Sequence, residues 1–69
     1  MSTSEVIERN IRAAIRKAKR NGTTGMSFAN LKQLTSTDGI TCHPTVYHRT
    51  FPEVAQYVAM KLNFNLYHA

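Results

Sequence analysis

Residues 4–20, SEVIERNIRAAIRKAKR, carry the clearest structural pattern in the chain. Apolar side chains recur there at the i, i+4, i+7, i+8 and i+11 spacing of one helical face, at Ile7, Ile11, Ala14, Ile15 and Ala18. Ser2 or Ser4 can cap the first turn, and Asn21-Gly22 is a good C-terminal stop. The pattern therefore predicts an amphipathic helix that anchors the rest of the fold.

A second, short helix is predicted after a loop at residues 23–25. Met26 and Phe28 favour a short extended piece, and Ser27 suits the N-cap of the helix. The apolar positions of this helix, spaced i, i+3 and i+6, should face the core and are Phe28, Leu31 and Leu34. The following TSTDG, residues 35–39, has an Asp-Gly pair and no apolar side chain, which indicates a turn.

Residues 44–49 should form a third helix, because Pro44 suits a first turn, where its missing N–H costs nothing. The sequence TFPE at residues 50–53 resembles a capping box with its proline in the first turn, so it predicts the start of a further helix. Its apolar stripe is Phe51, Val54, Ala55, Val58 and Leu62. Pro52 disfavours helical geometry in the residue before it, so we expect a break there. One helix over residues 44–62, kinked at Pro52, is the alternative.

The tail of the chain, NFNLYHA, alternates briefly at Phe64 and Leu66, which is typical of a short strand or a frayed end. Together these elements predict an all-α fold with three to four short helices around one core. A minor two-stranded β element, built from residues 26–28 and the tail, is compatible with this fold. A length of 69 residues allows one domain, over residues 1–69.

Positive charge is the strongest global feature of the sequence. Nine Lys and Arg against four Asp and Glu give a formal net charge of +5 and a pI near 9.9, which attracts polyanions. A solvated surface that keeps the protein soluble would also explain such a charge. Most of the cations gather in the first helix, at Arg9, Arg12, Arg16, Lys17, Lys19 and Arg20. Because the planar guanidinium suits phosphate, we predict that this helix presents a cationic face to a nucleic acid.

The segment TVYHR, residues 45–49, resembles the T-V-x-x-R core of recognition helices in helix-turn-helix and winged-helix DNA-binding proteins. The resemblance spans residues 28–51, and the long turn favours the winged-helix variant. It implies that Val46 packs in the core and that Arg49 contacts guanine. The residues that it places against DNA are Thr45, Tyr47, His48 and Arg49. Two short helices that only pack together, without contacting a groove, are the alternative.

Catalysis and metal binding are not expected. Cys42, the single cysteine, and the three histidines His43, His48 and His68 lack the spacing of a zinc site. Cys42 is expected to be a buried apolar residue, and His43 to support the start of a helix. The sequence has no Gly-rich phosphate loop and no convincing pair of acidic residues, so we expect no enzyme and no cofactor. A lone thiol, with neither a signal peptide nor an apolar membrane span, favours a cytoplasmic protein without membrane contact.

These observations favour a small basic DNA-binding protein, a regulator of transcription or of the nucleoid. The first helix would contact phosphates, and residues 45–49 would lie in the groove. An RNA-hairpin protein is one alternative, because RNIRAAIRKAKR, residues 9–20, resembles the arginine-rich helices that enter RNA hairpins. A protein that binds and inhibits a host protein is another, by analogy with the compact basic proteins of phages and plasmids.

Several large apolar residues near the end of the chain fall outside the stripe of the last helix. They are Tyr57, Met60, Phe64 and Tyr67. A second copy of the chain would cover them, which favours a homodimer with two DNA half-sites. The alternative is that they complete the small core from another direction.

Overall fold

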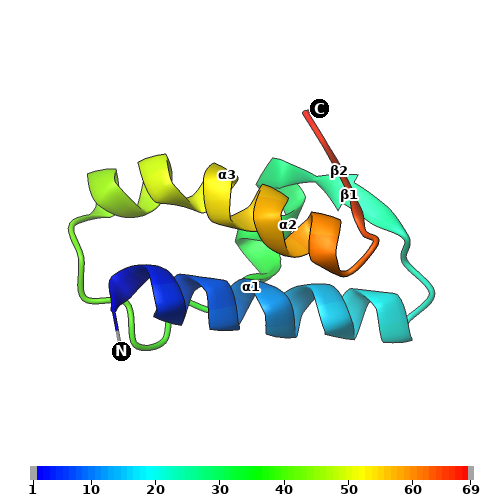
Figure 1. Cartoon of the computed structure of the whole chain (residues 1–69), viewed down its shortest axis with the longest axis horizontal. Coiled ribbons are helices and arrows are strands. Elements are labelled where there is room, and N and C mark those ends of the chain that lie inside the picture. The colour runs from blue at the N-terminus through cyan, green and yellow to red at the C-terminus, as the bar shows by residue number, and fades with distance from the viewer. Residues whose placement is uncertain (1, 69) are drawn as a thin grey trace.

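The computed structural model describes residues 2–68. In this part the chain forms three helices and two three-residue strands (Figure 1). In chain order they are α1 (Thr3–Arg20), β1 (Gly25–Ser27), α2 (Phe28–Leu34), α3 (Pro44–Lys61) and β2 (Asn65–Tyr67). The prediction of a mostly helical fold with a minor β element is therefore confirmed.

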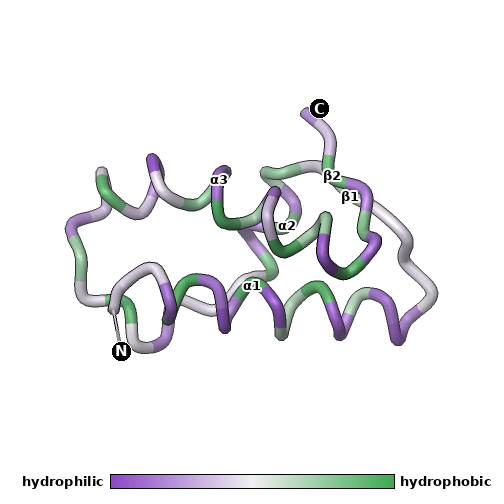
Figure 2. The backbone as a smooth tube through the Cα atoms, in the orientation of Figure 1, coloured by the Kyte–Doolittle hydropathy of each residue, from purple (hydrophilic) through white to green (hydrophobic). Residues whose placement is uncertain are grey.

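α1 forms where the sequence predicts it. The Ser2 hydroxyl caps the helix by accepting a hydrogen bond from the backbone amide of Glu5, and the helix ends at Asn21. The isoleucines of the predicted apolar face, Ile7, Ile11 and Ile15, are fully buried. Figure 2 shows apolar and strongly polar positions alternating along this helix.

α3 is one continuous helix through Pro52, so the predicted break at this residue is wrong. The capping box predicted at residues 50–53 is wrong for the same reason, since those residues lie inside the helix. Pro52 is exposed, whereas Phe51 before it and Ala55 after it are buried in the core. Burial of one side of the helix thus outweighs the hydrogen bond that proline cannot make. His43 caps the start as expected, because its ring nitrogen accepts a hydrogen bond from the amide of Thr45.

α1 and α3 form the main packing unit. They lie side by side and run in the same direction, so their C-terminal ends lie at one end of the molecule (Figure 1). Their contact encloses most of the core, whose largest fully buried side chains are Phe51, Ile7, Ile11, Ile15, Leu31 and Val58.

α2 starts as predicted, with the Ser27 hydroxyl accepting a hydrogen bond from the amide of Asn30. Leu31 is buried in the core, but Leu34 is 59% exposed, so its predicted inward position is wrong. Six residues advance a helix by about 600°, which turns Leu34 well away from the face that Phe28 begins.

The connection from α2 to α3 is fastened to α1. The side-chain amide of the buried Asn10 donates hydrogen bonds of 3.0 Å to the carbonyls of Ser36 and Asp38. The Thr35 hydroxyl donates to the Leu31 carbonyl at 2.7 Å, which closes the end of α2. These bonds satisfy polar groups that would otherwise be buried at a cost.

The tail forms a strand, as one of the two predictions for it states. β2 pairs with β1 in parallel, and Gly25, Met26 and Ser27 lie opposite Asn65, Leu66 and Tyr67. Met26 is buried, so the pair closes one end of the core.

Candidate nucleic-acid interface

Three arginines of α1 point away from the core. Arg16 follows the fully buried Ile7 by nine residues, which is about two and a half turns at about 100° per residue, so the two side chains leave the helix on opposite sides. The same spacing relates Arg20 to the buried Ile11 and Arg9 to the buried Ala18. These three residues, here named the outer arginine row, extend over about 16 Å of helix, at about 1.5 Å per residue. Within the row, the Arg9 guanidinium lies beside Gly39 of the connection between α2 and α3.

The other three predicted cations of α1 lie outside the row. Arg12 forms an ion pair with Glu8, with 2.6 Å between the guanidinium nitrogen and the carboxylate oxygen. The Lys19 ammonium donates a hydrogen bond to the backbone carbonyl of Leu62, at the C-terminal end of α3. Lys17 lies beside α2 and lines the hollow between the two helices.

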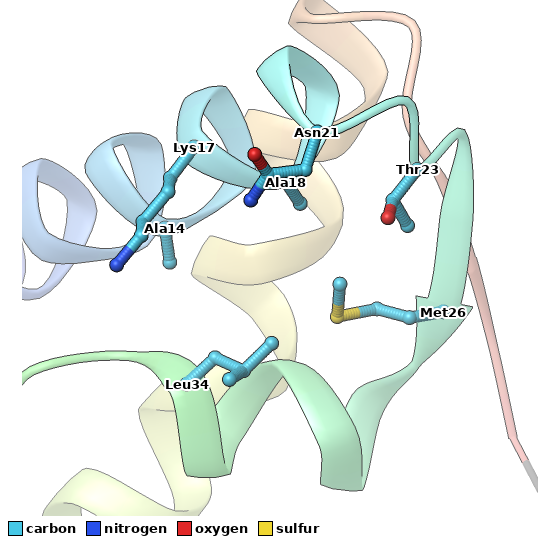
Figure 3. Close-up of a pocket in the computed structure, with 7 residues that line it drawn as sticks. All are labelled: Ala14, Lys17, Ala18, Asn21, Thr23, Met26 and Leu34. Carbon is cyan, nitrogen blue, oxygen red and sulfur yellow. The ribbon is translucent and has the colours of Figure 1, made fainter.

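This hollow has a volume of about 180 Å³, and Figure 3 shows the side chains around it. Its lining comes from α1, the loop after it, β1 and α2, and consists of Ala14, Lys17, Ala18, Asn21, Thr23, Met26 and Leu34. Sites that hold small molecules or cofactors usually have about 300–1,000 Å³, so this hollow fits only a side chain or two.

The orientation that the recognition-helix resemblance implies for Val46 and Tyr47 is wrong. Tyr47 is only 8% exposed and stacks obliquely on Phe51, whereas Val46 is 37% exposed. The core face of the long α3 is set by Tyr47, Phe51, Ala55 and Val58, at i, i+4, i+8 and i+11. That spacing turns Val46 outward, so Tyr47 is not available to DNA.

The Tyr47 hydroxyl is buried without a hydrogen-bond partner among residues 2–68. Burial, and to a smaller extent the nearby Cys42 thiol, raise the pKa of Tyr47 above its ordinary value. The phenol therefore stays neutral at physiological pH. Cys42 itself is half-buried and packs against the core cluster, close to the buried position expected of it.

The remaining predicted groove residues are exposed. His48 contacts the ammonium of Lys32 from α2, which also lies 5.4 Å from the centre of the Tyr47 ring. Thr45 and Arg49 are exposed on the first turns of α3. Arg49 precedes the buried Val58 by nine residues, so it points away from the core on α3.

The two predicted sets therefore do not form one continuous surface. The outer arginine row faces outward from α1, and Arg49 faces outward from α3, on the other side of the core that the two helices enclose. A single partner that lies flat on one set does not reach the other.

A contact between two exposed side chains of α3 was among those missed at the sequence level. The Lys61 ammonium lies 5.1 Å from the centre of the Tyr57 ring, and Tyr57 is 50% exposed. Lys61 stands far from the basic stretch of α1 in sequence. The signal for the contact was the i, i+4 spacing of an aromatic and a cation on one helix.

Comparisons of the chain with protein-family models, with curated proteins and with solved structures find no match. Within residues 2–68, no three side chains of His, Cys, Asp or Glu come together as metal ligands would. No helix in that part of the chain is long and apolar enough to cross a membrane. The features that remain to suggest a function are the outer arginine row and the exposed cations and aromatics of α3.

Proposed function

We propose that the protein binds nucleic acid, DNA in the first place, through phosphate contacts made by the outer arginine row of α1. The observation that carries this proposal is the direction of the row, since each of its members leaves α1 on the side opposite a buried residue. No carboxylate interrupts the sequence between Glu8 and Asp38. The guanidinium groups thus offer planar, charged donors to phosphate oxygens.

Contacts of this kind position a protein on DNA without selecting a sequence. The row covers about 16 Å, roughly half of one turn of B-DNA, so it would follow the phosphates along one side of the helix. The protein would then act as a small regulator of transcription or of the nucleoid that tolerates many sequences. Sequence selection would need a second contact, because the exposed Thr45, His48 and Arg49 lie on α3 and not beside the row, and Tyr47 is buried.

The test is fluorescence anisotropy with a labelled duplex of about 20 random base pairs and a labelled RNA hairpin, over a series of salt concentrations. We expect the duplex to bind with a Kd below about 10 μM at about 100 mM salt, and the affinity to fall steeply as salt rises. Tighter binding of the hairpin would favour the RNA alternative on the same helix. Absence of binding to both would overturn the proposal.

A pair of variants with the same change in net charge locates the interface. Arg16→Gln should weaken duplex binding about 3- to 10-fold and lower the salt slope by about one. Arg49→Gln should change binding to random duplex by less than about 2-fold, because it points away from the core on the other helix. Equal losses in the two variants would show that only net charge matters. A larger loss in Arg49→Gln would move the interface to α3.

A further inference from the structure

Lys19 lies on the flank of α1 that faces away from α2. Asn10 marks the flank towards α2, because it lines a hollow together with Leu34. Lys19 follows Asn10 by nine residues, which is about two and a half turns, so it leaves the helix on the opposite side. Lys19 therefore lies on the side of α1 that α2 does not cover.

Tyr57 likewise lies on the flank of α3 that faces away from α2. His48 marks the flank of α3 towards α2, because it contacts Lys32. Tyr57 follows His48 by nine residues, so it points to the opposite side. Lys19 and Tyr57 consequently share the one face of the α1–α3 layer that α2 leaves open.

The C-terminal ends of the two helices meet at this face. The hydrogen bond from Lys19 to the Leu62 carbonyl joins them, and Figure 1 shows both helices ending at the same end of the molecule. Lys61 lies one turn after Tyr57 with its ammonium over the ring, and Arg16 lies one turn before Lys19. We name this set of Arg16, Lys19, Tyr57 and Lys61 the α1–α3 end face. The nearest carboxylate on this flank of α3 is Glu53, one turn before Tyr57 and away from the end.

We propose that the α1–α3 end face binds a single strand of nucleic acid, with one base stacked on Tyr57 and the flanking phosphates on Lys61, Lys19 and Arg16. This proposal rests on the proposed function, and it adds that the protein prefers a single strand to a duplex. A half-exposed aromatic ring with an ammonium over it, on a face that carries two further cations, has the composition of single-strand sites, where stacking tolerates any base. A duplex keeps its base faces stacked inside, so it gains the phosphate contacts but not the contact with Tyr57. On binding, the Lys61 ammonium moves from the ring to a phosphate.

The experiment compares labelled oligothymidylate and oligouridylate of about 15 nucleotides with the random duplex, on the intact protein. We expect the single strands to bind more tightly than the duplex. Tyr57→Ala should weaken single-strand binding about 5- to 10-fold and leave duplex binding within about 2-fold, whereas Tyr57→Phe keeps the stacking ring and the affinity. Tyr67→Ala is the matched control, because Tyr67 is 51% exposed but lies on β2, and it should leave binding unchanged.

The outcomes separate this proposal from the function on which it rests. Duplex binding that equals or exceeds single-strand binding, with Tyr57→Ala like the parent protein, would overturn the single-strand proposal and leave the outer arginine row as the duplex site. Absence of binding to all three probes would overturn both. Equal losses in Tyr57→Phe and Tyr57→Ala would also contradict stacking, and circular dichroism of each variant checks that it is folded. The better of the two single strands assigns DNA or RNA as the ligand.

Discussion

Gly25 lies so close to Asn65 across the strand pair that a Cβ atom at position 25 would be 2.7 Å from the Asn65 carbonyl oxygen. Gly25→Ala must therefore push the strands apart or distort them. We expect it to lower the free energy of unfolding by about 1–3 kcal/mol, measured by urea denaturation. Thr24→Ala is the control, because this residue is exposed and contributes its backbone carbonyl to the pairing, and it should change stability by less than about 0.5 kcal/mol. Equal stability of Gly25→Ala and the parent protein would contradict the register.

Asn10 holds the connection between α2 and α3 through the two carbonyls that its amide contacts. Asn10→Ala leaves those carbonyls without their donor and should cost about 1–3 kcal/mol of unfolding free energy. Asn10→Asp should cost more, since it places a carboxylate against two carbonyl oxygens. Asn30→Ala, on an exposed position of α2, should stay within about 0.5 kcal/mol of the parent protein. If Asn30→Ala lost as much unfolding free energy as Asn10→Ala, the loss in Asn10→Ala could not be assigned to its two hydrogen bonds.

Pro52 interrupts the hydrogen-bond ladder in the middle of α3 while its side chain is exposed. Pro52→Ala restores an N–H that can donate to the His48 carbonyl one turn before. We expect the thermal midpoint to rise and the unfolding free energy to increase by about 1–3 kcal/mol, less the entropy that proline removes from the unfolded chain. Gln56→Ala, one turn later and also exposed, should have an effect below about 0.5 kcal/mol. A less stable Pro52→Ala protein would mean that the proline fits a local bend which alanine does not keep.

Tyr47→Phe removes a buried hydroxyl that has no partner among residues 2–68. It should leave the unfolding free energy at neutral pH unchanged or raise it by up to about 1 kcal/mol. The pKa of Tyr47 is raised in the folded protein, so the folded state holds this proton more tightly than the unfolded chain does. The stability from this group is complete below the ordinary pKa of about 10 and is lost as the pH rises through the folded pKa.

Urea denaturation at neutral pH and above about pH 10 measures both effects. The parent protein should lose more stability over that interval than Tyr47→Phe does. Tyr57→Phe, the same substitution at an exposed position, is the matched control. Identical pH dependence in the parent protein and Tyr47→Phe would contradict the assignment.

α1 could be predicted almost to its ends because its apolar spacing, caps and charges all lie within one stretch of sequence. α3 could not, because the local rule for Pro52 opposes the burial of Phe51 and Ala55, and burial depends on residues from α1. The same competition between a local pattern and the burial of a whole helix face decided which of Val46 and Tyr47 lies in the core. A motif of five residues favours Val46 in the core, whereas the spacing over the whole helix favours Tyr47.

Of the candidate site, the part that lies on one helix was predictable, and the contacts between helices were not. The outer arginine row follows from helical geometry alone once the buried face of α1 is known. The contacts of Lys19 with Leu62 and of Lys32 with His48 join residues from different helices. No spacing within one helix encodes such pairs, so they required the fold.

The parallel pairing of β1 with β2 has a kinetic consequence. Gly25 and Asn65 are forty residues apart, and their pairing closes a loop that contains both α2 and α3. Helices form within about a microsecond from local contacts, whereas the strands can pair only when this long loop closes. We therefore expect the strand pair to form after the individual helices on each folding event. Because each strand has only three residues, we expect the strand pair to be the first part of the native protein to unfold locally.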